Sequence, residues 1–367
     1  MNKIIFVGNT AWGMYNFRKN VFSALLGSGY KIIIISPEDT TFQKKLTNLG
    51  CYCKSIKMDA KGLNPIKDLI LLFSLYKILK REKPSMCFFY TIKPNIYGSI
   101  AATLLKIPHI AITTGLGHTF LKKGIISKIV RCLYRIAFIK TLQVWFLNKD
   151  DKEAFLSSRI IKEHKAFLLK SEGVDLSYFP KTSQPQDISF ILISRMLWNK
   201  GVGIYVDAAR VLKKKYPHVT FNLLGFVGVN SPNAISVNQI NNWEDQGIIK
   251  YLGVTEDVRP FIAQSSCVVL PSYYGEGIPM CLLEGAAMAK PLITTYSVGC
   301  KDVVDDGVTG LICAPKDVDS LIEVMEKTML LPIYQRQQMG EAGRRKMENE
   351  FDITLIVQQY KKQLAIL

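Results

Sequence analysis

The chain has 367 residues, of which 48% are hydrophobic and 21% are charged, and its formal net charge is +17. This mix excludes a disordered chain, a collagen-like repeat and a coiled coil, and the length predicts two domains that each bury a core. The longest uncharged apolar run, 69–76, is far shorter than the ~20 residues of a membrane span. The N-terminal apolar stretch is too short for a signal peptide.

The first half of the chain alternates short apolar runs with amphipathic segments. We expect strands at 3–8, 31–36, 51–58, 86–91 and 110–113, and helices at 16–26, 42–49, 65–81 and 97–105. Strands that alternate with helices through short connections predict a parallel sheet covered on both faces.

The same alternation begins again near residue 188. We expect strands at 188–194, 219–224, 267–271 and 292–295, and helices at 203–216, 258–264, 279–289, 318–329 and 355–364. Segment 226–242 is polar and rich in turn residues, which predicts a mobile loop beside the ligand site. Segment 172–186 is rich in Pro, Ser and Gln, and it is the best candidate for a linker.

These patterns predict an α/β protein with two doubly wound, Rossmann-like parallel-sheet domains. The expected boundaries are 1–173 and 174–367, with 351–367 as a segment that could pack back on the N-terminal domain. In such folds the ligand binds beyond the carboxyl ends of the strands, so we expect the ligand in a cleft where the two domains face each other.

The positive charge is concentrated in one half. Residues 1–173 contain 28 Lys and Arg against 10 Asp and Glu, a net charge of +18, whereas the remaining residues carry −1. This asymmetry predicts an anionic partner for the first half: nucleic acid, acidic lipid or a phosphorylated substrate. The chain has no recognisable nucleic-acid-binding motif, which disfavours the first of these. Its eight cysteines form no CxxC pair, as expected of a reduced cytosolic protein without a zinc ribbon.

Two segments favour lipid among these partners. Segment 120–140 combines many isoleucines with Lys122, Lys123, Lys128, Arg131 and Arg135, a pattern typical of a helix at a membrane surface. A core helix with snorkelling cations explains the same pattern, and both interpretations stay open. Segment 69–81 is apolar and then basic, and a buried helix with cations at its C-terminus explains it equally well.

The most informative motif lies at 270–289. A strand ends at Leu270, a glycine-flanked loop follows, and Pro279 suits the first turn of the next helix. The amides of that helix N-terminus would attract a diphosphate. Glu276 in the loop suits sugar hydroxyls, and Glu284 in the helix suits a ribose. A solvated helix face is the alternative for Glu284, but its apolar neighbours indicate burial, and a buried glutamate needs a partner.

A second motif follows the strand 188–194. Arg195 and Lys200 stand just past its carboxyl end, where they could neutralise a diphosphate leaving group. The chain has no GxGxxG after a strand, no P-loop, and no GxSxG, HExxH or EF-hand motif, which disfavours nicotinamide dehydrogenases, P-loop enzymes and zinc hydrolases.

Together these motifs resemble glycosyltransferase family 4, whose members are retaining enzymes of the two-domain GT-B architecture. The resemblance rests on the Glu276/Glu284 spacing, on Arg195 with Lys200-Gly201, and on segments 173–175 and 302–311. In the N-terminal half, 90–102 and 115–120 resemble one branch of bacterial enzymes that act on undecaprenyl-pyrophosphate-linked sugars. That branch includes α-1,3-N-acetylgalactosaminyltransferases.

The resemblance implies roles for single residues. Arg195 and Lys200 would bind the donor diphosphate, Glu276 the transferred sugar and Glu284 the ribose. Gly13, in the loop after the first strand, would approach the same phosphates, and Gly277 and Ile278 would complete the donor site. His118 would contact the transferred sugar or the acceptor, although a structural histidine beside Gly117 is an equally good interpretation. Lys93 and the five cations of 120–140 would contact the acceptor or the membrane. The family uses no metal and no cofactor.

The expected function is therefore transfer of a hexose or hexosamine, with N-acetylgalactosamine as the best guess, from a UDP-sugar to an undecaprenyl-pyrophosphate-linked saccharide. The enzyme would work at the inner face of the plasma membrane, in assembly of an N-glycan, O-antigen or capsule, and the +18 domain would meet the anionic membrane surface. Two alternatives remain: the same fold with a soluble acceptor, and a non-enzymatic binder of nucleic acid.

Overall fold

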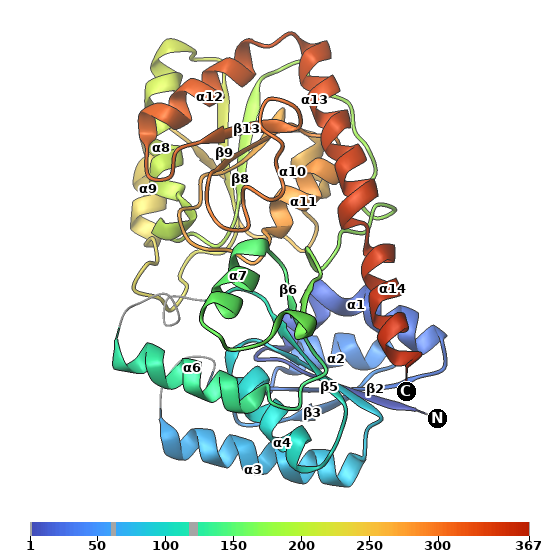
Figure 1. Ribbon diagram of the computed structural model, residues 1–367. Coiled ribbons are helices and arrows are strands. Elements are labelled where there is room, and N and C mark those ends of the chain that lie inside the picture. Colours follow the sequence, from blue (N-terminus) through green and yellow to red (C-terminus); the bar gives the residue numbers. More distant parts are fainter. Residues whose placement is uncertain (1, 60–63, 117–123, 367) are drawn as a thin grey trace. The chain divides into compact units, whose positions relative to one another are not determined.

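The computed structural model describes residues 2–59, 64–116 and 124–366 (Figure 1). The chain forms two compact units, one of residues 1–173 together with 353–367, the other of residues 174–352. We call them unit 1 and unit 2 and describe each by itself.

Unit 1 contains a parallel sheet with the strand order β3-β2-β1-β4-β5-β6-β7. Its strands are β1 (Lys3–Val7), β2 (Lys31–Ser36), β3 (Tyr52–Ser55), β4 (Met86–Tyr90), β5 (His109–Thr113), β6 (Gln143–Phe146) and β7 (Ala166–Leu168). Its helices are α1 (Ala11–Gly27), α2 (Thr40–Asn48), α3 (Pro65–Glu82), α4 (Ser99–Leu104), α6 (Ile125–Ala137), α7 (Lys149–Ser157) and α14 (Ile353–Leu364), with short turns η1 (Pro94–Gly98) and η2 (Glu163–Lys165).

The central strands of unit 1 are apolar along most of their length because helices cover both faces of the sheet. Every residue of β4 is buried, and so is every residue of β2 except the first. The chain leaves β1 toward β2 and leaves β4 toward β5, in opposite directions along the sheet. Since such crossovers are right-handed, α1 and α2 cover one face while α3, α4 and α6 cover the other. Helix α14 packs against α1.

A buried polar network ties four segments of unit 1 together. Arg18 of α1 donates a hydrogen bond to the carboxylate of Glu172, and its guanidinium lies 3.8 Å from the centre of the Tyr90 ring. The Tyr90 hydroxyl in turn lies 2.5 Å from the hydroxyl of Tyr360 on α14. All four side chains are buried, so the charges of Arg18 and Glu172 have little access to water.

Unit 2 contains a second parallel sheet, with the order β10-β9-β8-β11-β12-β13. Its strands are β8 (Ser189–Ile193), β9 (Thr220–Leu224), β10 (Lys250–Tyr251), β11 (Cys267–Leu270), β12 (Leu292–Thr295) and β13 (Gly310–Cys313). Its helices are α8 (Val202–Lys215), α9 (Val237–Asp245), α10 (Arg259–Ala263), α11 (Met280–Ala287), α12 (Val318–Leu330) and α13 (Ile333–Lys346), with short turns η3 (Trp198–Lys200) and η4 (Met347–Phe351).

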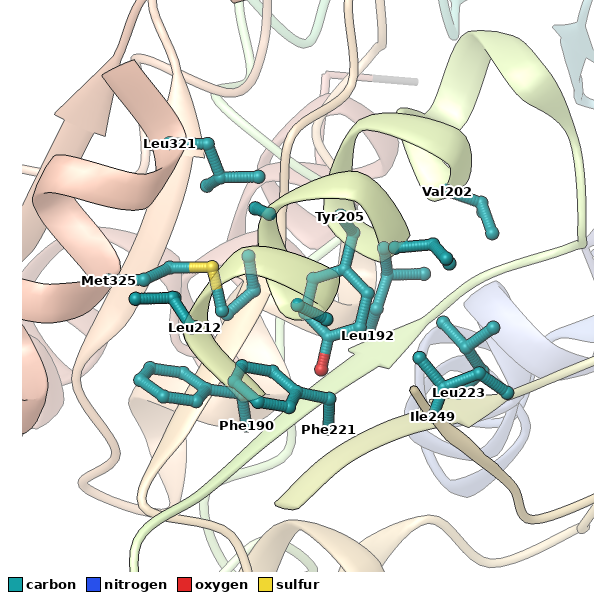
Figure 2. Close-up of a cluster of buried hydrophobic side chains, with 14 of the residues drawn as sticks. Phe190, Leu192, Val202, Tyr205, Leu212, Phe221, Leu223, Ile249, Leu321 and Met325 are labelled. Atoms are coloured by element: carbon teal, nitrogen blue, oxygen red, sulfur yellow. The ribbon is translucent and has the colours of Figure 1, made fainter. Parts of the chain in front are cut away.

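One core of unit 2 lies between its sheet and the helices α8 and α12. Figure 2 shows Tyr205 and Leu212 of α8 above the stacked rings of Phe190 and Phe221, with Met325 of α12 beside them. A second cluster packs α11 and the segment after residue 173 against the opposite face of the same strands.

The predicted α/β class with two Rossmann-like parallel sheets is confirmed. The interpretation of 226–242 as a mobile loop is wrong for its second part, because α9 begins at Val237. Ser236 accepts a hydrogen bond from the amide of Gln239, and Ile240 and Trp243 are buried one helical turn apart. The predicted linker also packs more tightly than expected, since Val174 and Phe179 are buried in unit 2.

We expect the stability of unit 1 to depend on pH through His109, which is fully buried at the start of β5. Its Nδ1 lies 2.9 Å from the carbonyl oxygen of Ile107, and its Nε2 lies 3.0 Å from the hydroxyl of Thr141. Burial, with a smaller contribution from Lys165, lowers the pKa of His109 from 6.5 to about 4. The unfolded chain therefore takes up the proton first, and stability that is complete above pH 6.5 falls as the pH decreases toward 4.

The pKa difference corresponds to about 3 kcal/mol. The measurement is thermal unfolding between pH 7 and pH 4, for the wild-type chain and for His109→Gln. We expect the variant to lose less stability than the wild type over this range. An identical pH dependence in both proteins would show that other groups control it.

Candidate active site

The candidate active site of unit 2 lies where its strand order reverses. Strands β8 and β11 are neighbours, but β8 is followed by β9 on one side and β11 by β12 on the other. At such a reversal the loops beyond the two strands diverge and leave room for a ligand at the carboxyl edge of the sheet. The two loops here are 194–201, after β8, and 271–279, after β11.

Glycines bring these loops into direct contact with their neighbours. A Cβ on Gly201 would lie 2.0 Å from the carbonyl oxygen of Pro271, and its φ of 79° is one that side chains rarely adopt. A Cβ on Gly225, after β9, would lie 1.9 Å from the carbonyl oxygen of Ser194. Only glycine permits approaches this close. The backbone therefore fixes where the residues of both loops stand.

The central contact of the site is an ion pair between Lys200 and Glu276. The Lys200 Nζ lies 2.5 Å from the Glu276 Oε1, and the side chains are only 15% and 13% exposed. The hydroxyl of Ser272 lies 3.0 Å from the same carboxylate oxygen. Charges this well shielded need partners. The pair therefore holds one cation and one carboxylate at fixed positions on the two loops.

The end of β12 and the loop that follows it, 296–301, hold the backbone of the loop that carries Glu276. The amide of Glu276 donates to the carbonyl oxygen of Val298 at 3.1 Å. The hydroxyls of Thr295 and Ser297 both donate to the carbonyl oxygen of Ser272. A Cβ on Gly299 would lie within 2.6 Å of the carbonyl oxygens of Glu276 and Gly277. The loop that holds Glu276 is thus braced on both sides.

Glu284 acts electrostatically on Cys281, a thiol that Lys200 and Glu276 also influence. Burial raises the pKa of the Cys281 thiol, the carboxylates of Glu284 and Glu276 raise it further, and the ammonium of Lys200 opposes them. Burial also raises the pKa of Cys300 to about 11, again with a contribution from Glu276 and opposition from Lys200. Lys200 and Glu276 therefore act electrostatically on both thiols, and Glu284 acts on the thiol of Cys281.

The remaining predicted donor residues of unit 2 stand at the edge of this cluster. Arg195 is exposed in the loop after β8. Ile278 packs half-buried against the second core cluster, and Gly277 is half-buried beside it. Helix α11 follows Pro279, the N-cap residue, whose side chain makes no capping hydrogen bond. The positive end of that helix lies directly after the loop of Glu276, as the sequence predicts.

The prediction for Gly13 is wrong in its local structure. Gly13 does not lie in a loop but is the third residue of α1, and its amide donates to the hydroxyl of Thr10, the N-cap, at 3.0 Å. A Cβ on Gly13 would lie 2.9 Å from that hydroxyl. The predicted approach of Gly13 to the donor phosphates stays a prediction.

Unit 1 has a small cavity at its own strand-order reversal, between β1 and β4. The cavity measures about 140 Å³ and is lined by Asn9, Met58, Thr91, Ile92, Lys93, Thr114 and Gly115. Thr91 has a φ of 70°, and its buried hydroxyl has no hydrogen-bond partner among the described residues. The ammonium of Lys93 donates a hydrogen bond to the carboxylate of Asp68 on α3 at 2.7 Å. The same carboxylate accepts a hydrogen bond from the hydroxyl of Tyr97 at 2.9 Å. A polar ligand in this cavity would meet the hydroxyl of Thr91 and the positioned cation of Lys93.

The predicted acceptor and membrane residues of α6 have different surroundings. Lys128 and Arg135 are exposed, and Arg131 is half-buried. Arg135 is engaged within unit 1, because its guanidinium donates to the carbonyl oxygen of Ser158 at 2.7 Å. His118, Lys122 and Lys123 lie outside the described residues, so their predicted roles stay predictions.

Sequence reasoning missed several supporting residues. Ser272 and Asn199 join the two loops of unit 2, since the Ser272 hydroxyl lies 3.2 Å from the Asn199 carbonyl oxygen. Asp68 was missed as the partner of Lys93 because 25 residues separate them. Ser272 alone carried a usable signal, as a small hydroxyl residue two positions after a buried strand and four residues before the glutamate.

None of the described helices is both long and apolar enough to cross a bilayer. No group of three His, Cys, Asp or Glu side chains in the described ranges is arranged to hold a metal ion.

Comparison with protein-family models identifies both halves of the chain. Residues 3–148 match the family described as glycosyl transferase 4-like, and residues 187–330 match glycosyl transferases group 1. The chain therefore belongs to the glycosyltransferases with this pair of domains, and the resemblance drawn from the motifs is confirmed at the level of family and fold.

Two curated relatives are similar over most of their length. An N,N'-diacetylbacillosaminyl-diphospho-undecaprenol α-1,3-N-acetylgalactosaminyltransferase of Campylobacter jejuni is 28% identical, over 98% of this chain and 97% of the relative. A UDP-Gal:α-D-GlcNAc-diphosphoundecaprenol α-1,3-galactosyltransferase of Escherichia coli is 26% identical, over 82% and 80%. Among solved structures, Anabaena HepE in complex with UDP and glucose has the same fold, with a TM-score of 0.81 at 17% identity over the whole of both chains.

Proposed function

We propose that the chain transfers a hexosamine or hexose, with N-acetylgalactosamine as the first candidate, from a UDP-sugar to a lipid-pyrophosphate-linked saccharide during assembly of a bacterial glycan. The donor would bind at the carboxyl edge of the unit 2 sheet. The ion pair of Lys200 and Glu276 at the strand-order reversal is the single observation that carries this proposal, because it holds in one place the two groups that a sugar diphosphate needs.

The chemistry of the pair supports a donor site. An ammonium has three protons, and Glu276 takes only one of those of Lys200, so the others can bind phosphate oxygens. A carboxylate such as that of Glu276 accepts hydrogen bonds from sugar hydroxyls. Arg195, exposed in the loop after β8, and the amides at the N-terminus of α11 would add positive charge for the diphosphate. Glu284 would accept hydrogen bonds from the hydroxyls of the ribose.

The reaction breaks the bond between the sugar C1 and the phosphate oxygen and forms a bond between C1 and the acceptor oxygen. We propose that configuration is retained by attack on the same face, with the departing phosphate oxygen taking the acceptor's proton. Lys200 and Arg195 would stabilise the charge that develops on the diphosphate, which is where preorganised charge contributes most to the rate. This proposal needs no metal ion and assigns no side chain as a catalytic base.

The acceptor side of the proposal rests on unit 1 and on the relatives. Both curated relatives are named for undecaprenol-diphosphate-linked acceptors. Residues 1–173 hold a net charge of +18, which suits a pyrophosphate and the headgroups of an anionic membrane. We propose that the protein binds peripherally to the inner face of the plasma membrane, with Lys93 near the acceptor and Lys128 and Arg131 of α6 near the lipid surface.

The direct experiment is incubation of the protein with a panel of UDP-sugars and a synthetic prenyl-diphosphate sugar, with the products read by mass spectrometry. The proposal predicts addition of one sugar residue to the lipid-linked acceptor. Transfer to water-soluble sugars alone would replace it by the second candidate, the same reaction with a soluble acceptor. Absence of transfer from every UDP-sugar would contradict both.

We expect Glu284→Ala to weaken UDP binding by about ten- to a hundredfold, since a carboxylate that accepts hydrogen bonds from two hydroxyls contributes on the order of 1.5–3 kcal/mol. Isothermal titration calorimetry with UDP measures this change. Glu323→Ala, which removes an exposed carboxylate from α12, is the matched control and should bind UDP as the wild type does. Equal affinities of the Glu284 variant and the wild type would remove Glu284 from the donor site.

A further inference from the structure

Helix α3 of unit 1 carries an apolar stripe on its outer face. Ile66, Leu69, Ile70 and Phe73 are 71%, 53%, 56% and 62% exposed. Their spacing of three, four and seven residues places them on one side of the helix. The opposite side of the helix packs against the core of unit 1 through Leu71, Leu75 and Leu79, which are buried. The stripe is therefore a second apolar face that unit 1 does not bury.

The outer face of α3 is also cationic. Continuing the helical spacing beyond Phe73 places Lys77 and Lys80 on the same side, and both are exposed. The two carboxylates of the helix are engaged elsewhere: Asp68 is buried against Lys93, and Glu82 lies 2.8 Å from Lys54. The outer face thus presents apolar side chains in its first half, ammonium groups in its second half, and no carboxylate of its own.

Helices α4 and α6, which neighbour α3, also carry exposed apolar side chains. Both lie on the same face of the sheet as α3, and α4 contacts each of the other two (Figure 1). Ile126 and Ile129 of α6 are about half exposed, as is Ile136, and Leu104 of α4 is 65% exposed. Three neighbouring helices on one side of the sheet therefore carry exposed apolar side chains, in the half of the chain that holds the excess positive charge.

We propose that α3 is a membrane-contact helix, whose stripe of Ile66, Leu69, Ile70 and Phe73 enters the headgroup region of an anionic bilayer while Lys77 and Lys80 bind lipid phosphates. This inference deepens the proposed function, on which it rests for the presence of a lipid-linked acceptor. Amphipathic helices with a basic flank bind anionic lipid surfaces in this manner. A second copy of the chain fits less well, because two surfaces rich in lysine would repel each other.

The test compares binding of the full chain to vesicles of phosphatidylglycerol and phosphatidylethanolamine by co-sedimentation. We expect Leu69→Gln/Phe73→Gln to lower the vesicle partition coefficient by about tenfold or more, since two apolar side chains would no longer leave water. Leu330→Gln/Tyr334→Gln is the matched control, because these unit 2 side chains are 65% and 58% exposed, and it should bind as the wild type does. At about 0.5 M NaCl, which screens the lysines, the wild type should keep residual binding that the α3 variant loses.

The depth to which α3 enters the bilayer can be measured with F73W. Brominated lipids should quench the fluorescence of the tryptophan introduced at this position. Equal vesicle affinity of the α3 variant and the wild type, or a F73W signal that brominated lipid leaves unchanged, would overturn the proposal. A dimer that the α3 variant loses would overturn it in favour of self-association. UDP binding and transfer to a short-chain, water-soluble acceptor should be unchanged in the α3 variant. Failure of those two measurements in the wild type would instead contradict the proposed function.

Discussion

Replacing Lys200 with alanine should lower the rate of sugar transfer by about 10²–10³-fold. The expected magnitude is that of removing one preorganised group that stabilises developing charge in a transition state. The loss should appear mainly in kcat, because the charge on the diphosphate grows as the bond to the sugar breaks, while UDP-sugar binding should weaken to a smaller degree.

Several controls make the Lys200 result specific. Lys214→Ala removes an exposed ammonium from α8 in the same unit and should leave transfer unchanged. Lys200→Arg keeps the charge and should recover part of the rate. Since Lys200 also pairs with Glu276, thermal unfolding of Lys200→Ala must be measured alongside its activity. Transfer by a well-folded Lys200→Ala protein within twofold of the wild type would contradict the site assignment.

Replacing Arg18 with methionine should destabilise unit 1 by about 3–5 kcal/mol, because the substitution leaves the buried carboxylate of Glu172 without its partner. The same substitution also removes the cation that stacks on Tyr90. The effect should appear in thermal or denaturant unfolding of the full chain as an early transition.

The decisive comparison is the double variant Arg18→Met/Glu172→Leu. Removing both charges eliminates the uncompensated burial, so most of the lost stability should return. Tyr360→Phe removes only the hydroxyl beside Tyr90 and should cost about 1 kcal/mol. If Arg18→Met unfolds at the wild-type temperature, the ion pair contributes nothing measurable to unit 1.

Sequence patterns predicted most of the central strands and the placement of Lys200 and Glu276 beyond them for a common physical reason. Strands buried on both faces, such as β2 and β4, must be apolar along their length, and the loops at their carboxyl ends must then carry the polar groups. This is why Lys200 and Glu276, 76 residues apart, could both be assigned to one edge of a sheet.

The failures have equally specific causes. Helix α9 was not predicted because its sequence is mostly polar and only Ile240 and Trp243 are buried. Strands β6, β7, β10 and β13, each of four residues or fewer, were not predicted. The engagement of Gly13 by Thr10 and of Lys93 by Asp68 depends on side-chain placement that residue spacing does not reveal.

The discontinuity of unit 1 has a consequence for biosynthesis. The chain passes out of unit 1 after Gly173 and returns at Ile353, and Tyr360 of the returning helix is buried among Phe6, Phe88 and Trp145. A nascent polypeptide therefore cannot complete this aromatic cluster until the last helix has left the ribosome, whereas residues 174–352 are contiguous and free to fold earlier. The domain that is translated first would be the last to finish folding.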